Sequence, residues 1–423
     1  MIKNPSNWAG NYVYRAAQIH HPETVEQIQE LVHSRPRLKA LGTRHSFNDI
    51  ADSSGDLISL AHFDKILSLD HENRTVTVEA GIRYGQLAHW LHEQGYALHN
   101  LASLPHISVA GACATATHGS GDRNGNLATA VSAMELVTGN DEVVVLSWEQ
   151  DREQFEGAVV GLGGLGVVTK LTLDVSPTFQ MQQDVYENLP LVELEEHYDE
   201  LTSNMYSVSL FTDWRNSSFN QVWLKRHAPD GISVKAEPEL FRARLATNNL
   251  HPIASLSAEN CTEQMGICGP WFERLPHFRM DFTPSSGEEL QSEYLIPRQH
   301  AFAALRAIDQ LREHIALLLQ ISEVRTIAAD NLWMSPCYKQ AFIAIHFTWK
   351  QDWEGVRNLL PVIEEKLAPF DARPHWGKLF TISHARLQTL YEKMPDFQTL
   401  LQSYDPQGKF RNEFLNRYIF GMP

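Results

Sequence analysis

Hydrophobic residues recur with two different spacings in the first part of the chain. Within residues 24–32 the apolar side chains lie three or four positions apart, which predicts a short helix capped by Thr24. Within residues 74–79, Val76 and Val78 alternate with polar residues, which predicts a strand. Further elements are expected as strands at 38–41 and 57–60 and as a helix that ends at Gly95. Short helices that alternate with short strands predict an α+β or α/β fold.

A glycine-rich segment divides two apolar runs further along. Gly161, Gly163 and Gly166 match the G-x-G-x-x-G pattern of dinucleotide-binding proteins. In those proteins the pattern opens a helix, because the helix N-terminus holds the pyrophosphate. Residues 167–173 instead alternate and are β-branched, which predicts a strand, and no leading βαβ unit is visible. We therefore reject a Rossmann domain and expect these glycines to let a loop press against a cofactor held elsewhere.

Two later strands each carry two polar residues on one face. These strands are predicted at residues 319–327 and 341–349. Strand side chains alternate, so Glu323 and Arg325 share one face of the first, and His346 and Thr348 share one face of the second. Four such side chains offer many donors and acceptors to a hydroxyl-rich ligand. A solvent-facing sheet is the alternative. One histidine with one carboxylate is too few ligands for a metal site.

The chain is long enough for two domains, and its texture changes near the middle. A length of 423 residues exceeds what one hydrophobic core normally supports. After Ser176-Pro177 come aromatic-rich strands and polar connectors, so we place a boundary near residue 178. The other expected elements are a hairpin formed by 131–137 and 142–146 and a helix at 298–312.

Composition and charge exclude several partners. The 51 acidic and 35 basic residues give a net charge of −16, which argues against nucleic acid or an anionic membrane as a partner. Four cysteines without metal spacing indicate reduced thiols and a cytoplasmic protein. The N-terminus lacks the apolar region of a signal peptide, and the longest apolar run is far too short to span a membrane.

Two loops carry the candidate binding chemistry of the first domain. Gly42 ends an apolar run and is followed by Thr43, Arg44, His45 and Ser46, so backbone N–H groups there can converge on an anion. A solvated turn is the alternative. Residues 101–126 are long and rich in small side chains, which suits a backbone that lies against something large and flat. A flexible surface loop is the alternative, but embedded apolar residues argue against it.

Seven motifs, in order, resemble the vanillyl-alcohol-oxidase superfamily of flavoproteins. They are residues 7–11 (NWAGN), 42–46 (GTRHS), 103–111 (SLPHISVAG), 117–120 (THGS), 163–166 (GGLG), 375–378 (HWGK) and 405–410 (DPQGKF). Within that superfamily the chain is most similar to the alditol (xylitol) oxidases, which are near relatives of the sugar-lactone oxidases. The resemblance covers nearly the whole chain, and the motifs are specific as a set.

The resemblance implies a two-domain α+β fold of the PCMH type that binds FAD. The FAD-binding domain would span residues 1–178, the substrate domain 179–375, and residues 376–423 would return to the FAD domain and active site. The substrate domain would be built on a mixed or antiparallel sheet flanked by helices. His45 matches the histidine that bonds covalently to the flavin. The implied cofactor-binding residues are Leu41, Gly42, Thr43, Arg44, His45, Ser46, Ser103, Ser108, Gly111, Ala112, Cys113, Ala114, Thr117, His118, Gly119, Gly163, Gly166 and Val168.

The implied reaction is oxidation of a polyol. The substrate-binding positions are Ser103, Glu323, Arg325, His346, Thr348 and Lys378, of which Glu323, Arg325, His346 and Lys378 would also be catalytic. Hydride would pass from the terminal C1 of an alditol such as xylitol or sorbitol to flavin N5, giving an aldose, while O2 is reduced to H2O2. We expect His346 to take the hydroxyl proton, and Ala102 to lie beside the flavin, where oxygen access is controlled.

Three alternatives to this reaction differ in what they share with the chain. A sugar-1,4-lactone oxidase or dehydrogenase (gulono- or galactonolactone type) shares the fold, and the His346-x-Thr348 pair favours alditols over it. A carbohydrate-binding protein without flavin would not need the glycine segments. A nicotinamide dehydrogenase would need the Rossmann unit. No metal is expected; the partners are a small polyol and O2, and the protein is expected to be a monomer.

Overall fold

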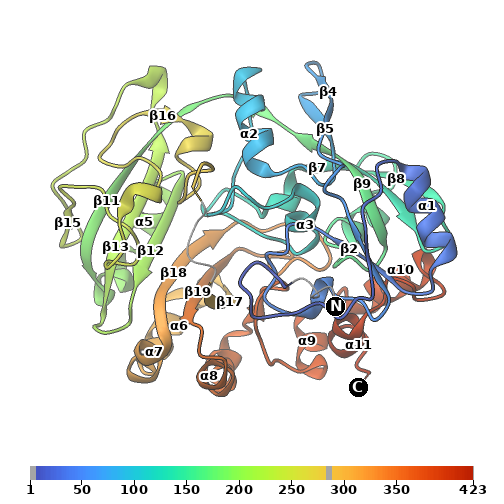
Figure 1. Ribbon diagram of the computed structural model, residues 1–423. Helices are drawn as coiled ribbons and strands as arrows, with labels where there is room; N and C mark the ends of the chain where they lie inside the picture. Colours follow the sequence, from blue (N-terminus) through green and yellow to red (C-terminus); the bar gives the residue numbers. More distant parts are fainter. Residues whose placement is uncertain (1–5, 283–287, 423) are drawn as a thin grey trace.

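The computed structural model describes residues 6–282 and 288–422, and two large sheets dominate it (Figure 1). The smaller sheet has five antiparallel strands in the order β4-β5-β9-β7-β8. Its strands are β4 (Ile66–Asp70), β5 (Thr75–Glu79), β7 (Val131–Thr138), β8 (Val143–Ser147) and β9 (Gly166–Asp174). The β7–β8 hairpin confirms the predicted one, and β9 confirms that a strand, not a helix, follows the glycine segment.

A three-stranded parallel sheet and several short helices complete the N-terminal part. Its strands, in the order β1-β3-β2, are β1 (Ile19–His20), β2 (Leu38–Leu41) and β3 (Asp56–Ser59). The helices are α1 (Val25–Ser34), α2 (Tyr84–Glu93), α3 (Val109–Ala114) and α4 (Arg152–Ala158). Thr24 caps α1 as predicted, because its side chain accepts a hydrogen bond from the Gln27 amide. A two-residue ribbon pairs β6 (Tyr96–Ala97) with β10 (Ser176–Pro177).

The larger sheet has ten strands, and all of its pairings are antiparallel. Its main path runs β14-β15-β11-β13-β12-β18-β19-β17-β20, with β16 beside β11. The strands are β11 (Gln180–Pro190), β12 (Ser207–Thr212), β13 (Ser218–His227), β14 (Glu239–Leu240), β15 (Ala243–Leu245), β16 (Gly269–Pro270), β17 (Glu289–Pro297), β18 (Leu319–Ile327), β19 (Phe342–Lys350) and β20 (Arg373–Pro374). The two strands predicted at 319–327 and 341–349 are confirmed as β18 and β19, the second displaced by one residue.

Helices cover one face of this sheet and leave the other face for the site. They are α5 (Leu194–Ser203), α6 (Ala301–Asp309), α7 (Arg312–Leu318) and α8 (Trp353–Leu367), of which α6, α7 and α8 lie together at the bottom of Figure 1. Ile345 and Phe347 of β19 join Ile308 of α6 and Leu360 of α8 in one buried cluster. Side chains alternate along β19, so those of His346 and Thr348 lie on the other face of the sheet and point away from the helices.

The helix predicted at 298–312 is confirmed as α6 over residues 301–309, but its predicted ends are wrong. A 3-10 turn spans Arg298–His300, and α6 ends at Asp309 before α7 begins. The Asp309 carboxylate accepts a hydrogen bond from the Ser217 hydroxyl at 2.9 Å, and the Leu311 amide bonds the Ile308 carbonyl in a tighter turn. The tighter turn ends the α-helix here, which hydrophobic spacing alone cannot reveal.

The last helices return to the N-terminal part of the chain. They are α9 (His384–Leu390), α10 (Met394–Tyr404) and α11 (Glu413–Tyr418). Asn412 caps α11 by accepting a hydrogen bond from the Leu415 amide. Its side-chain amide donates to the carbonyls of Asp49, Ile50 and Asp52, which closes the end of the chain onto the loop after His45.

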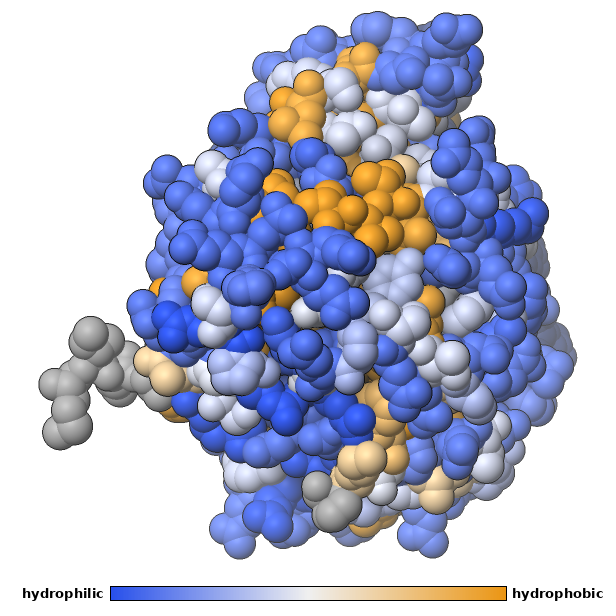
Figure 2. Space-filling view, turned by 90° about the vertical axis from the view of Figure 1, so that its right-hand side faces the viewer, coloured by the Kyte–Doolittle hydropathy of each residue, from blue (hydrophilic) through white to orange (hydrophobic). Residues whose placement is uncertain are grey.

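Most of the surface seen from one side is polar. Figure 2 shows a largely hydrophilic face with a patch of hydrophobic residues across its upper half. Among the described residues, no helix combines the length and the apolarity needed to cross a bilayer. All four cysteines are free, as the sequence analysis expected.

Candidate active site

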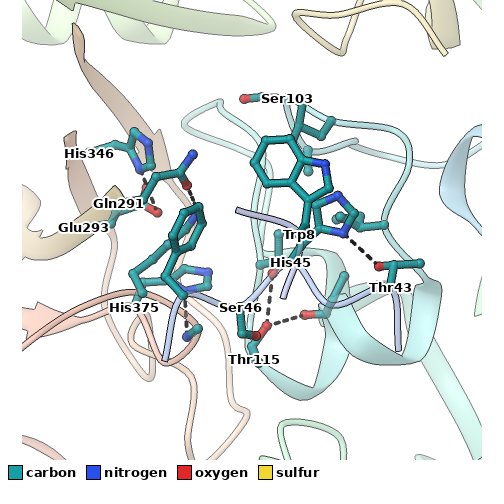
Figure 3. Close-up of a pocket in the computed structure, with 18 of the residues that line it drawn as sticks. Trp8, Thr43, His45, Ser46, Ser103, Thr115, Gln291, Glu293, His346 and His375 are labelled. Carbon is teal, nitrogen blue, oxygen red and sulfur yellow. Dashed lines mark hydrogen bonds and ion pairs between the residues drawn. The ribbon is translucent and has the colours of Figure 1, made fainter. Parts of the chain in front are cut away.

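A cavity of about 390 Å³ lies between two walls of different construction. Residues of the loop after β2 and of the segment 102–118 form one side, which we call the loop wall. The other side is formed by the side chains of β17, β18 and β19 that point away from the helices, together with the turn at 375–378; we call it the strand wall. Figure 3 shows the two facing each other, with His45, Trp8 and Thr43 on one side and His346, Gln291 and Glu293 on the other.

Glycine backbone is open to the cavity in the loop wall. A Cβ added to Gly42 would come 2.7 Å from the Ser108 Oγ, and one added to Gly111 would come 2.8 Å from the same atom. The Ser108 amide donates to the Thr43 Oγ1 at 3.2 Å, which ties the two segments of this wall together. Backbone and small side chains thus form a smooth surface against which a large flat molecule can lie.

His45 projects from this wall beside Trp8. Their rings stack with centroids 5.2 Å apart, and the His45 Nδ1 lies 3.1 Å from the Thr43 Oγ1 (Figure 3). Burial, together with the nearby Lys378, lowers the pKa of His45 to about 4. The imidazole is therefore neutral at pH 7 and keeps a nucleophilic lone pair.

Arg44, the residue before His45, points elsewhere. It adopts a φ of 65°, which is the left-handed region that non-glycine residues rarely occupy. Its guanidinium Nη1 donates to the Ser6 carbonyl at 3.3 Å, and its own carbonyl accepts from the Trp8 amide at 2.8 Å. Arg44 thus fastens the N-terminal segment that brings Trp8 onto His45.

Strand register brings the polar residues of the strand wall into rows. His346 of β19 lies opposite Glu323 of β18 on one side and opposite Glu293 of β17 on the other. Thr348 lies opposite Gln291 in the next row. These positions share one face because side chains two apart on a strand point the same way.

Glu293 is the centre of the charged cluster. Its Oε1 accepts a hydrogen bond from the Arg325 Nη2 at 2.8 Å and lies 3.2 Å from the His118 Nε2. Its Oε2 lies 3.4 Å from the His346 Nδ1. Burial opposes ionisation of Glu293, but His118, Arg325 and His346 together outweigh burial and hold its pKa well below the usual range. Glu293 is therefore a buried anion held between one guanidinium and two imidazoles.

His346 is poised to accept a proton. Its Nε2 lies 3.2 Å from the Thr348 Oγ1. Burial lowers the pKa of His346 below the usual value, and Glu293 partly restores it. A neutral imidazole backed by a carboxylate can take a proton from a hydroxyl and stabilise the charge that results.

Lys378 connects the two walls. Its ammonium donates to the Gln291 Oε1 and lies 4.7 Å from the Phe47 ring centroid. The Asn48 side chain donates to the carbonyls of Trp376 and Lys378, so the loop that carries His45 also holds the turn that carries this cation. Burial lowers the pKa of Lys378 to about 8, although Glu293 and Glu289 raise it.

Most of the predicted residues line this one cavity. All six predicted substrate-binding residues do so, and the Arg325 Nη1 donates to the Ser103 Oγ at 3.3 Å. The predicted cofactor residues do so as well, except Cys113, Gly119, Gly166 and Val168. Those four pack elsewhere: for example, a Cβ on Gly119 would meet the Leu101 carbonyl at 2.3 Å, and the Cys113 Sγ lies 3.5 Å from the Tyr84 hydroxyl.

Several lining residues escaped the sequence analysis. Glu289, Gln291 and Glu293 alternate along β17, and His277 also lines the cavity, as does His375, which the sequence analysis named only as part of the 375–378 motif. The alternation on β17 is the same signal that identified Glu323 and Arg325, so it could have been found. The two histidines lie on irregular segments, where no periodicity marks them.

The loop wall fits FAD. The smooth glycine surface suits a flat ring system, and the cavity continues past His45 to Gly163 and to the buried ammonium of Lys39. A Cβ on Gly163 would come 3.2 Å from the Lys39 Cε. A long ligand with a flat end, rather than a compact one, matches a cavity that runs this far.

Comparisons with known proteins agree with this architecture. A family described as FAD binding domain matches residues 16–147, and one described as D-arabinono-1,4-lactone oxidase matches residues 285–418. The chain is 48% identical over 419 residues to an alditol oxidase of Streptomyces sp., covering 98% of this chain and 99% of that one. It is 27% identical to an L-gulono-1,4-lactone dehydrogenase of Mycobacterium tuberculosis, covering 98% of each. A crystal structure of cholesterol oxidase from B. sterolicum shares the fold, with a TM-score of 0.78, 13% identity and coverage of 99% and 96%.

Proposed function

Because the chain belongs to the alditol oxidase family of FAD-binding flavoproteins, we propose that it oxidises the terminal hydroxyl of an alditol with FAD as cofactor. The observation that carries this proposal is the strand wall. There His346 and Arg325 contact buried Glu293, Arg325 also lies beside Glu323, and the wall faces a surface that can hold a flavin. Xylitol and sorbitol are the substrates we expect, with an aldose as product.

The loop wall would hold the cofactor. Gly42, Thr43, Ser108 and Gly111 would lie against it with backbone and small side chains. Bound FAD supplies the redox chemistry, since it accepts hydride from the alcohol carbon and is reoxidised by O2 to give H2O2.

The strand wall would bind the polyol and manage its proton. Thr348 and Glu323 offer hydrogen bonds to hydroxyl groups. His346 would accept the proton of the reacting hydroxyl, and Glu293, 3.4 Å from its Nδ1, would stabilise the imidazolium. Arg325 and Lys378 would stabilise negative charge that develops at the alcohol oxygen. A charge pair 4 Å apart is worth roughly 4 kcal/mol at an effective dielectric constant of about 20.

We also propose that His45 holds the flavin covalently. Its neutral imidazole can act as a nucleophile, and its place in the loop wall supports the assignment. Acid precipitation followed by an absorption spectrum tests it: a yellow pellet is expected in the wild type and a colourless one in His45→Ala. Flavin that stays in the supernatant of the acid-treated wild type would refute the covalent bond.

A lactone substrate is the second candidate, because the D-arabinono-1,4-lactone oxidase family matches residues 285–418. Production of H2O2 should be compared on xylitol, sorbitol and L-gulono-1,4-lactone, with reduction of an artificial electron acceptor measured in parallel. We expect peroxide from the alditols and little turnover of the lactone. A preference for the lactone, or purified protein without flavin absorbance, would overturn the proposed function.

The same proposal includes the setting of the enzyme. Four free cysteines, three of them buried, suit a reducing cytoplasm. We propose a monomer with an FAD-binding part at 1–178, a substrate part at 179–375 and a C-terminal return at 376–423. The ten-stranded sheet between Gln180 and Pro374 supports this division.

A further inference from the structure

A buried lysine lies behind the strand wall. Lys225 of β13 is 1% exposed and does not line the cavity. Its Nζ donates to the carbonyl of Leu275 at 2.6 Å and to that of Pro276 at 3.1 Å, and it lies 3.2 Å from the His277 Nδ1. Burying a lysine costs much hydration free energy, and the contacts that Lys225 makes must offset that cost.

His277 continues the chain of contacts into the site. Its Nε2 lies 2.7 Å from the Glu323 Oε1. Arg325 and His277 hold the pKa of Glu323 below its usual value in spite of burial, so Glu323 is an ionised carboxylate that can only accept. The imidazole proton therefore sits on Nε2, which donates to Glu323, and the Nδ1 of the neutral ring accepts from the Lys225 Nζ. Burial lowers the pKa of His277 to about 4, in keeping with a neutral ring whose tautomer is set at both ends.

Glu323 depends on this contact for its orientation. The Arg325 Nε lies 3.5 Å from the same carboxylate oxygen but makes no hydrogen bond within the described residues. The His277 bond therefore fixes one oxygen of Glu323 and leaves the other free to accept a hydroxyl. The backbone amide of His277 also donates to the Ser103 carbonyl at 3.2 Å, so the same residue steadies both substrate-binding positions.

We propose that Lys225 and His277 are positioning residues that form a hydrogen-bonded relay, Lys225 to His277 to Glu323, which orients Glu323 to bind the polyol. This inference rests on the proposed function, because it assigns Glu323 to substrate binding. The relay acts at a distance: Lys225 affects binding although it touches neither substrate nor cofactor.

A purely structural role for Lys225, closing the carbonyls of residues 275 and 276, makes a different prediction. If Lys225 acts through Glu323, its removal should matter only while Glu323 is present. If Lys225 only stabilises the fold, its effect should be the same in either background. A double-mutant cycle separates these cases, because contacts in one network are non-additive and independent ones add.

The cycle compares Lys225→Met, Glu323→Gln and the double variant, with kcat and KM measured on xylitol. We expect Lys225→Met to raise KM about 10- to 100-fold, the effect of losing a charge-assisted hydrogen bond. In the Glu323→Gln background, Lys225→Met should raise KM less than about threefold. Equal effects in both backgrounds would overturn the relay. Lys409→Met is the control, since Lys409 is another buried lysine but donates to the Val32 carbonyl, and neither residue lines the cavity; its KM should stay at the wild-type value.

His277 provides a second test if Lys225→Met does not fold. His277→Gln keeps an amide donor for Glu323 and an acceptor for Lys225, whereas His277→Leu keeps neither. We expect His277→Gln to retain a KM within about tenfold of the wild type and His277→Leu to lose much more. Equal loss in both variants, with equal flavin content, would contradict the relay.

A spectroscopic measurement keeps the relay separate from the proposed function. In protein with 15N-labelled histidine, the signal that disappears in His277→Gln should report a neutral ring protonated on Nε2. Protonation on Nδ1 would refute the relay even if alditols are oxidised. If the wild-type protein does not oxidise alditols but His277 is protonated on Nε2, the proposed function is refuted, and with it the role of the relay in polyol binding.

Discussion

The two walls of the cavity are built from different kinds of residue. Apart from His45 and its neighbour Trp8, the loop wall is mostly backbone and small side chains, and a Cβ added to Gly42 or Gly111 would come within 2.8 Å of the Ser108 Oγ. The strand wall is long charged side chains on three adjacent strands, with Glu293 only 2% exposed between Arg325, His118 and His346. The first wall is defined by shape and the second by charge.

This difference predicts how each wall fails. A wall defined by shape is damaged by added volume, which excludes the cofactor and leaves local electrostatics intact. A wall defined by charge is damaged by removal of one partner, which leaves another buried charge uncompensated. Flavin content and turnover should therefore respond separately to substitutions in the two walls.

The largest effect is expected from volume added to the loop wall. Gly111→Leu should yield folded protein that retains no flavin and has no turnover, because the new side chain occupies the space open above Gly111. Absorbance per mole of protein after purification measures the loss, and circular dichroism checks the fold. The flavin content of Gly111→Ala should lie between those of the wild type and Gly111→Leu, since the Ser108 hydroxyl can rotate away. Wild-type flavin content in Gly111→Leu would contradict a shape-defined wall.

His346→Ala tests the opposite behaviour in the strand wall. We expect kcat on xylitol to fall about 10²- to 10⁴-fold, the usual range for a lost general base, with flavin content unchanged. Steady-state peroxide assays and flavin absorbance measure the two quantities on one preparation. Turnover equal to the wild type would remove His346 from the proton path.

Arg325→Met should lower kcat/KM about 10²- to 10³-fold. The change leaves Glu323 and Glu293 as buried carboxylates without their shared guanidinium. It also removes a donor that would stabilise developing negative charge, a loss worth about 10²- to 10³-fold in rate. Arg325→Lys is the matched control and should recover part of the loss by restoring the charge. Losses of similar size in both variants would indicate that guanidinium geometry, not charge, dominates this position.

The charge of the strand wall should also appear in the pH profile. Burial, helped by the nearby Arg325, lowers the pKa of Lys378 to about 8, although Glu293 and Glu289 raise it. The ammonium is the form that stabilises developing negative charge, so kcat/KM should fall as pH rises through about 8. Lys378→Arg should keep its charge and shift this alkaline limb upward. An unmoved limb in that variant would assign the titration to another group.

The smallest effect is expected at the junction of the walls. Ser103→Ala removes the 3.3 Å hydrogen bond from Arg325 but leaves the backbone of residue 103 held by the amides of His277 and Phe278. KM should rise about 2- to 10-fold, as for one neutral hydrogen-bond partner, with kcat nearly constant. A change in flavin content would mean that Ser103 belongs to the loop wall instead.

Sequence reasoning performed differently for the two walls. On the strand wall, alternation identified Glu323, Arg325, His346 and Thr348, and their shared site is now visible in the register of β18 and β19. The same alternation on β17 was missed, so Glu293, the centre of the cluster, was missed with it. On the loop wall no periodicity exists: glycine and small side chains mark residues 42–46 and 101–126 as candidate binding loops, and resemblance to a family assigns Gly42, His45 and Gly111 to the flavin.

The sequence by itself determined local structure: where apolar residues alternate, which residues share a strand face, and where glycine leaves the backbone bare. Those properties depend on neighbours within a few positions. Tertiary structure alone decided that β12, β18, β19 and β17 lie side by side, so that Glu293 meets His346 across 53 residues of sequence and Lys225 meets His277 across 52. Such pairings are set by long-range packing and loop closure, which no local pattern encodes.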